Sequence, residues 1–145
     1  MRVQVAVIGS GPSGLLLGQL LHLAGIETIV LEQRSAPYVL SRIRAGVLEQ
    51  GMVEMLDRAK VGARLHSEGL VHSGFDVLFG GMRHRIDLSG LTGGRRVVVY
   101  GQTEVTKDLR DARAAAGAKT VYEADEVSIH GFETSRPTVR YRKDR

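Results

Sequence analysis

The chain of 145 residues contains no cysteine and no long apolar run. Without cysteine it cannot form disulfide bonds, thiolate metal sites or a thiol nucleophile, and a reducing compartment is compatible with it. The apolar stretch from Leu15 to Leu21 is interrupted by Gly18 and Gln19 and is far too short to span a bilayer. No basic region followed by an apolar core marks a secretory signal. We therefore expect a cytoplasmic protein without a membrane partner.

Aromatic residues are scarce, at 5% of the chain, and the net charge is +4. Together these two properties decide whether the chain is expected to bind nucleic acid. Residues 136–145 hold five basic residues and one acid, a net charge of +4, whereas residues 1–135 balance at 15 basic and 15 acidic residues. The basic character therefore belongs to the tail. Because no stacking pattern of aromatic side chains accompanies those arginines, we do not expect binding of nucleic acid.

Metal-ligand spacing and signs of a second domain are also missing. The five histidines are scattered along the chain, so we predict no metal site. The sequence has no internal repeat, low-complexity tract or Ser/Pro-rich linker. Its length suits one domain with a sizeable core, and we treat residues 1–145 as a single domain.

The sequence does contain a dinucleotide-binding unit at its start. An apolar run over residues 3–8 leads into Gly9-Ser10-Gly11-Pro12-Ser13-Gly14, a helical pattern follows, and a second strand ends at Glu32. In such a turn the first glycine permits the bend, the second lets the backbone approach a pyrophosphate, and the third lets helix and strand pack closely. The helix dipole favours phosphate there. Glu32, eighteen positions after Gly14, can accept hydrogen bonds from ribose hydroxyls.

Hydrophobic periodicity and turn residues predict the remaining elements. Residues 33–46 suggest an irregular connection with at most a short turn, and residues 49–59 a helix. Residues 70–88 suggest an antiparallel hairpin with its turn at Gly80-Gly81. The later elements expected are a buried strand at 97–100, a helix at 103–116 ended by Gly117, a strand at 121–122, and antiparallel strands at 127–129 and 138–141. The fold class is α/β and Rossmann-like, with inserted antiparallel β-hairpins.

Two helices carry apolar residues at helical spacing. In the first, ended by Gly25 as a C-cap, these residues are Leu16, Leu20, Leu21 and Ala24. In the helix at 103–116, the residues expected to face inward are Val105, Leu109, Ala112 and Ala116.

Several segments resemble the FAD-dependent aromatic hydroxylases. They are the glycine turn with Leu15-Leu16-Leu17-Gly18, the acid Glu32, residues 38–51, residues 69–72 and residues 99–106. The resemblance covers essentially the whole chain but only the N-terminal part of such an enzyme. The family's later Asp-Gly and Gly-Asp motifs and its phenol pocket have no counterpart here. The resemblance therefore implies a Rossmann-like FAD-binding domain that is incomplete at its C-terminus and lacks the substrate domain.

The resemblance also assigns cofactor-binding roles. The residues implied to hold the FAD pyrophosphate are Gly9, Gly11, Pro12, Ser13 and Gly14. Glu32 would bind the adenosine ribose, and Gln102 would donate to ribityl or phosphate oxygens. Arg42 and Arg44 would approach the phosphates and the flavin, a task that suits the planar guanidinium group. The residues whose backbone would line the isoalloxazine ring are Ala45, Gly46 and Val47.

A second group of residues is implied to meet the nicotinamide cofactor and the substrate proton. Gln33, Arg34 and Tyr38 fall where the family meets the adenosine end of NADPH. A cation beside a ribose favours a 2′-phosphate, so NADPH is expected. The family usually has an arginine first, whereas Gln33 precedes Arg34 here, which leaves NADH open. His72 matches a catalytic histidine that ends a relay carrying the phenolic proton to solvent.

The implied activity is that of an FAD-dependent, NAD(P)H-using monooxygenase. With O2 it would hydroxylate a phenolic acid ortho to its hydroxyl, as a homodimer in full-length form. The chain alone is not expected to be a competent hydroxylase. A dehydrogenase whose glycine turn holds NAD stays open, although the hairpin at 70–88 argues against it, because a mononucleotide half would continue with parallel strands. A non-catalytic nucleotide-binding module also stays open.

Overall fold

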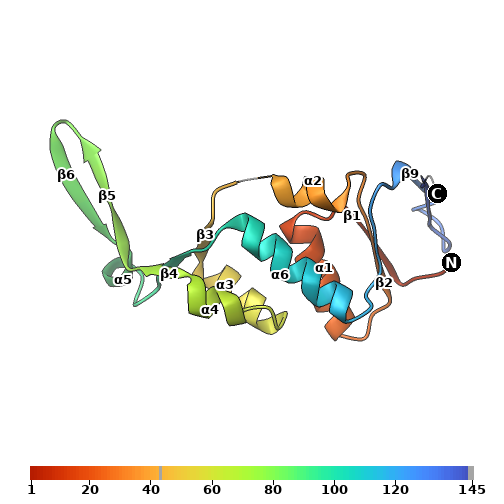
Figure 1. Cartoon of the computed structure of the whole chain (residues 1–145), viewed down its shortest axis with the longest axis horizontal. Coiled ribbons are helices and arrows are strands. Elements are labelled where there is room, and N and C mark those ends of the chain that lie inside the picture. The colour runs from red at the N-terminus through yellow and green to blue at the C-terminus, as the bar shows by residue number, and fades with distance from the viewer. Residues whose placement is uncertain (43, 144–145) are drawn as a thin grey trace. The chain divides into compact units, whose positions relative to one another are not determined.

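The computed structural model describes residues 1–42 and 44–143. The chain divides into two compact units, one formed by Met1–Ile43 with Thr106–Arg145 and one by Arg44–Val105 (Figure 1). Within the part of the chain that is described, no helix has the length and apolar character needed to cross a membrane.

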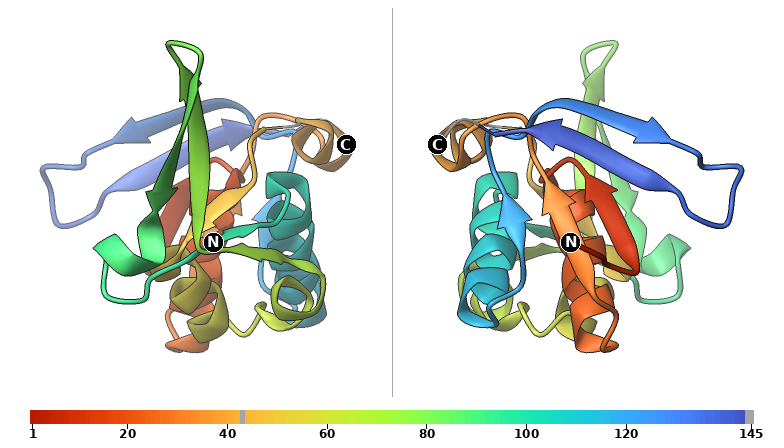
Figure 2. Two further views of the ribbon diagram at one scale, coloured as in Figure 1. Left: turned by 90° about the vertical axis from the view of Figure 1, so that its left-hand side faces the viewer. Right: turned by 90° about the vertical axis from the view of Figure 1, so that its right-hand side faces the viewer.

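The first unit contains a parallel sheet with the strand order β1-β2-β8. Its strands are β1 (Val5–Ile8), β2 (Thr28–Leu31) and β8 (Thr120–Val121). The helix α1 (Pro12–Leu23) and residues 106–115 of α6 (Gln102–Ala115) lie on one face of this sheet (Figure 2). The predicted strand, helix and strand at the start of the chain are confirmed.

The core of this unit is built from the sheet and the inner faces of the two helices. Leu15, Val30 and Leu109 are fully buried. On α1, Leu16 is buried as expected, but Leu20 and Leu21 are only partly buried and Ala24 is exposed. The apolar residues of α1 lie on nearly every side, so their spacing did not single out its buried face, which comprises Leu15, Leu16, Gly18 and Gln19.

The buried face of α6 differs from the expected one at its C-terminal end. Val105 and Leu109 are buried as predicted. Ala112 is partly buried, whereas Ala116 is exposed and follows the last helical residue. The side chain of Arg113 takes the inner position one turn after Leu109 and is 1% exposed.

Residues 33–46 are not wholly irregular, because they include the helix α2 (Ala36–Ser41). The Ser35 hydroxyl accepts a hydrogen bond from the Tyr38 N–H at 3.4 Å, and Pro37 lies in the first turn. Both features favour the start of a helix. Near the C-terminus, β9 (Asp125–His130) and β10 (Thr138–Arg142) form the expected antiparallel pair.

The second unit contains an antiparallel sheet in which β7 (Val97–Val99) lies between β3 (Val47–Glu49) and β4 (Leu70–His72). The expected hairpin over residues 70–88 is wrong at its start, because β4 pairs with β7 instead. The strand predicted as buried at 97–100 is partly exposed, and only Tyr100 is buried. The helices of this unit are α3 (Gln50–Arg58), α4 (Ala63–Glu68) and the short α5 (Leu88–Leu91).

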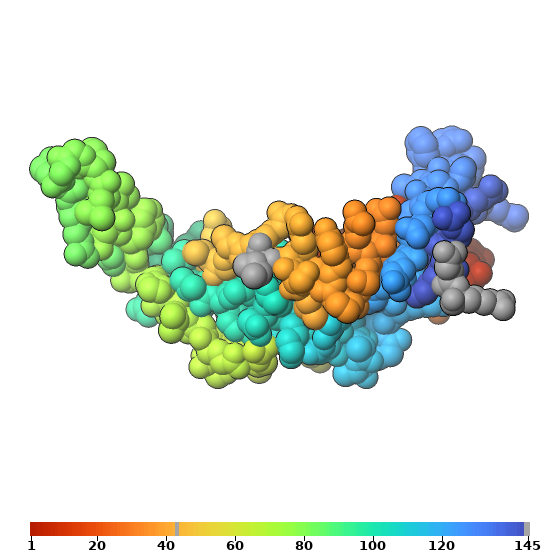
Figure 3. Space-filling model, turned by 45° about the horizontal axis from the view of Figure 1, so that its top comes forward, coloured from red at the N-terminus to blue at the C-terminus, as the bar shows by residue number. Residues whose placement is uncertain are grey.

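The hairpin itself consists of β5 (Gly74–Phe79) and β6 (Met82–Asp87). Gly80 and Gly81 both have positive φ, 57° and 74°, as the tight turn predicted here requires. The register separates two faces. The apolar face carries Phe75, Val77, Phe79, Met82 and Ile86, and the charged face carries Asp76, Arg83 and Arg85. The hairpin extends as an arm from the rest of the second unit (Figure 3).

Candidate cofactor site

The glycine turn between β1 and α1 has the geometry of a phosphate-binding loop. Gly9 has φ 104°, in the region that favours glycine, and its N–H donates to the Leu31 carbonyl at 2.7 Å. A Cβ on Gly14 would overlap the Gly9 carbonyl oxygen, so α1 begins in direct contact with the turn. A Cβ on Gly11 would meet no atom within 4 Å. The turn is therefore tight on its inner side and open on its outer side.

The N-terminus of α1 has no side-chain cap. Gly11 is the N-cap residue, Pro12 lies in the first turn, and that turn holds no acidic residue. Backbone N–H groups at the start of a helix need partners from outside the helix, and an anion is a suitable one. Ser13 is exposed beside them. These residues fit the pyrophosphate of a dinucleotide.

Glu32 lies directly after β2 and is anchored to the glycine turn. Its Oε2 accepts the Ser10 N–H at 2.8 Å and the Ser10 hydroxyl at 3.1 Å, and its Oε1 accepts the Arg34 N–H at 2.8 Å. Burial raises the pKa of the Glu32 carboxyl, but the hydrogen bonds from Ser10, Arg34 and the Gln33 backbone outweigh burial and hold the pKa below its ordinary value. Glu32 is therefore an ionised acceptor at neutral pH, as a ribose-binding carboxylate must be.

The lowered pKa of Glu32 predicts a pH dependence of stability. Its contribution is complete above the ordinary value of 4.5 and is lost as the pH falls through the lower pKa of the folded state. We expect Glu32→Gln to reduce the fall in unfolding free energy below about pH 4.5, measured by urea unfolding at several pH values. Glu27→Gln, at an exposed carboxylate, is the matched control. An acid profile changed equally by both variants would contradict the assignment.

Arg34, Tyr38 and Arg42 form a cluster next to Glu32. The guanidinium carbon of Arg34 lies 5.2 Å from the centroid of the Tyr38 ring, and that of Arg42 lies 5.8 Å from it. An Arg42 guanidinium nitrogen also lies 3.5 Å from the Tyr38 hydroxyl. The cluster therefore contains two residues predicted to contact NADPH, Arg34 and Tyr38, and one predicted to contact FAD, Arg42. Gln33 is exposed.

The second unit carries the remaining predicted residues. A Cβ on Gly46 would lie 2.5 Å from the Tyr100 carbonyl oxygen, and the Gly46 carbonyl accepts the Tyr100 N–H at 2.7 Å. This close contact fixes the backbone predicted to line the isoalloxazine ring. The other predicted positions are Arg44 and Ala45, both exposed, Val47 in β3, His72, exposed in β4, and Gln102, the first residue of α6.

Three side chains that the sequence did not point to surround Glu32 or support α1. They are Ser10, Tyr122 and Arg113. Ser10 is one of many small residues found at this place in a glycine turn, so its hydroxyl carried no signal. The sequence did contain a signal for Arg113, because Arg113 follows Leu109 by four residues on a helix and therefore shares its face.

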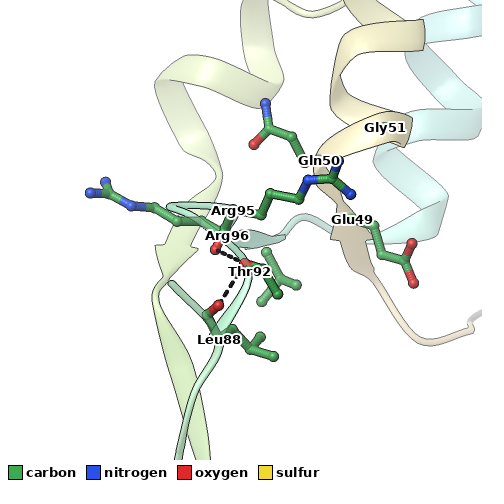
Figure 4. Close-up of a pocket in the computed structure, with 8 residues that line it drawn as sticks. Glu49, Gln50, Gly51, Leu88, Thr92, Arg95 and Arg96 are labelled. Atoms are coloured by element: carbon green, nitrogen blue, oxygen red, sulfur yellow. Dashed lines mark hydrogen bonds between the residues drawn. The ribbon is translucent and has the colours of Figure 1, made fainter. Parts of the chain in front are cut away.

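A separate cavity of about 260 Å³ lies in the second unit (Figure 4). Its lining residues are Glu49, Gln50, Gly51, Leu88, Thr92, Arg95, Arg96 and Val97. The Thr92 hydroxyl donates to the Leu88 carbonyl at 2.6 Å. No residue predicted to bind the cofactor lines this cavity. Among residues 1–42 and 44–143, no group of three His, Asp or Glu side chains could hold a metal ion.

Comparison with known proteins decides the family. Residues 2–145 match the family model described as an FAD binding domain. The chain belongs to this family of FAD-binding domains. The fold class and family expected from the residues are confirmed.

A p-hydroxybenzoate hydroxylase from Acinetobacter baylyi is 58% identical over 132 residues, which are 91% of this chain and 33% of that protein. The fold matches PqsL, a probable FAD-dependent monooxygenase from Pseudomonas aeruginosa, with TM-score 0.73 and 17% identity over 87% of this chain and 34% of that one. It also matches p-nitrophenol 4-monooxygenase PnpA from Pseudomonas putida, with TM-score 0.72 and 23% identity. That match covers 86% of this chain and 33% of the other. The chain spans about a third of the length of these relatives.

Proposed function

We propose that this chain is the part of a flavoprotein monooxygenase that binds the ADP portion of FAD. The enzyme would hydroxylate 4-hydroxybenzoate ortho to its hydroxyl, giving 3,4-dihydroxybenzoate with O2 and NADPH. The observation that carries this proposal is the 58% identity to p-hydroxybenzoate hydroxylase over 91% of the chain. The open glycine turn and the ionised Glu32 support it, because both suit the ADP portion of FAD.

Each predicted residue has a distinct task in this proposal. FAD, when bound, supplies the redox chemistry between the nicotinamide and O2. The uncapped N–H groups at the start of α1 bind its pyrophosphate, and Glu32 accepts hydrogen bonds from its ribose. Arg42 and Arg44 offset phosphate charge, and Gln102 donates a hydrogen bond. The backbone of residues 45–47, held by the contact between Gly46 and Tyr100, supports the ring.

The cluster around Tyr38 supports NADPH as the reductant. Arg34 and Arg42 bring two cations to an exposed aromatic ring. A 2′-phosphate can pair with a guanidinium group and an adenine can stack on tyrosine, so we propose NADPH over NADH. His72, exposed in β4, would pass the phenolic proton to solvent. We further propose that the full-length enzyme is cytoplasmic and that it forms a homodimer. Light scattering tests the homodimer.

Cofactor binding is tested with the purified chain and its visible spectrum. Mixed with FAD and passed through gel filtration, the chain should elute with flavin absorption bands. Titrations with NADH and NADPH are the comparison. A chain that prefers NADH to FAD would contradict the proposal and favour a dehydrogenase.

The reaction is tested in a chimaera in which this chain replaces the matched segment of the Acinetobacter enzyme. We expect formation of 3,4-dihydroxybenzoate with faster oxidation of NADPH than of NADH, measured by chromatography and absorbance. His72→Asn should slow turnover by at least about tenfold, as expected for loss of a proton-transfer group. A chimaera that binds FAD but makes no product, beside an active parent enzyme, would indicate a non-catalytic module.

A further inference from the structure

Ser10 lies beneath the glycine turn with its side chain fully buried. It is the residue between Gly9 and Gly11. Its N–H and its hydroxyl both donate to Oε2 of Glu32, at 2.8 and 3.1 Å. One residue of the turn therefore holds the carboxylate at the end of β2 with both its backbone and its side chain.

The two oxygens of Glu32 have different hydrogen-bond partners. A carboxylate oxygen accepts about two hydrogen bonds, so Ser10 occupies Oε2. Oε1 accepts the Arg34 N–H at 2.8 Å, and the Gln33 backbone is a further donor to the carboxylate. The paired bonds from Ser10 restrict reorientation of the carboxylate.

Tyr122, directly after β8, is another polar side chain near Ser10. Its hydroxyl is shielded from solvent and has no hydrogen-bond partner among the described residues. Burial raises the pKa of Tyr122, and Ser10, Arg110 and Arg113 offset this only in part. The phenol therefore stays protonated and neutral beside Glu32.

We propose that Ser10 is a positioning residue for nucleotide binding: its hydroxyl and its N–H hold the Glu32 carboxylate in position to receive the hydroxyls of an adenosine ribose. Ser10 itself does not contact the ligand. The inference rests on the proposed binding of the ADP portion of FAD at the glycine turn, and it names a determinant for the ribose.

The test compares two nucleotides on the full chain by calorimetric titration. ADP carries the ribose hydroxyls and 2′,3′-dideoxy-ADP lacks them. We expect Ser10→Ala to weaken ADP binding on the order of tenfold, the effect of one hydrogen bond to a charged group. Binding of dideoxy-ADP should change by less than about twofold. Equal weakening of both nucleotides would show that Ser10 only shapes the turn, and would overturn the proposal.

Two further variants complete the comparison. Ser10→Gly also lacks the hydroxyl and should weaken ADP in the same way, again without affecting dideoxy-ADP. It serves if Ser10→Ala does not fold, and equal weakening of both nucleotides would again overturn the proposal. Ser128→Ala, in β9, is the matched control, since its hydroxyl bonds to His130.

A readout without nucleotide separates this inference from the proposed function. If the wild-type chain binds neither nucleotide, the cofactor proposal fails. The effect of Ser10 on Glu32 is then measured as the pKa of Glu32, by NMR titration of its carboxyl carbon. Ser10→Ala should raise the Glu32 pKa, because it removes a donor to the charged form. An unchanged pKa would overturn the positioning role.

Discussion

Gly14→Ala should weaken nucleotide binding about a hundredfold and strongly destabilise the first unit. The added Cβ would overlap the Gly9 carbonyl oxygen, which belongs to backbone and cannot rotate away. The start of α1 must then move from the turn, which displaces the N–H groups that would meet the pyrophosphate. Overpacking of this kind costs roughly 3 kcal/mol. If the free energy of binding falls by the same amount, the affinity falls about a hundredfold.

Gly11→Ala is the matched control for this prediction. Its Cβ meets no protein atom within 4 Å, so the fold should keep its stability. FAD affinity should still fall, because the methyl group would occupy the open side of the turn. Urea unfolding separates the two variants and flavin fluorescence measures binding in both. If Gly14→Ala unfolds at the wild-type urea concentration, the close packing of α1 on the turn is not what requires glycine.

Arg113→Ala should be the second large loss, this time of stability. The guanidinium group is buried and donates to the Thr120 hydroxyl at 3.2 Å and to the Lys119 carbonyl at 3.0 Å, so it ties α6 to the start of β8. Truncation leaves a cavity and removes both bonds, at a combined cost of about 3 kcal/mol. Lys107→Ala, on the exposed side of the same helix, should cost less than about 1 kcal/mol.

A double-mutant cycle tests whether Gly18 makes room for that guanidinium group. A Cβ on Gly18 would lie 2.7 Å from Nη1 of Arg113 and 2.9 Å from Cγ2 of Val30. Gly18→Ala should therefore destabilise the wild type, and do so less in the Arg113→Ala background, with a coupling of about 1 kcal/mol. Unfolding free energies that simply add would contradict this contact.

The residues that could be predicted from sequence are those whose role depends on their immediate neighbours along the chain. Gly9, Gly14 and Glu32 follow a fixed spacing along one strand, turn, helix and strand. Gly80 and Gly81 mark their turn because the backbone there needs positive φ. Gly117 ends α6 for the same reason, with φ 65°. Each of these requirements is satisfied within a few residues, so the letters alone carry it.

The features that were missed depend on contacts between distant segments. The pairing of Leu70–His72 with β7 is set by tertiary structure, and alternation alone also suited a longer hairpin. The Ser10 hydroxyl acquires its role only because Glu32 folds back to it. Arg113 is charged, and a charged residue on a helix is usually solvated. Its burial follows from the space at Gly18 and the acceptors near β8.

The strand order β1-β2-β8 also has a consequence for how the molecule folds during synthesis. β1 and β2 pair across a short separation, Val5 with Thr28, whereas Val30 of β2 meets Thr120 of β8. Contacts between such distant residues form slowly. Until residues 120–121 have left the ribosome, the apolar strand β2 keeps one unpaired edge. That unpaired edge exposes the nascent intermediate to aggregation.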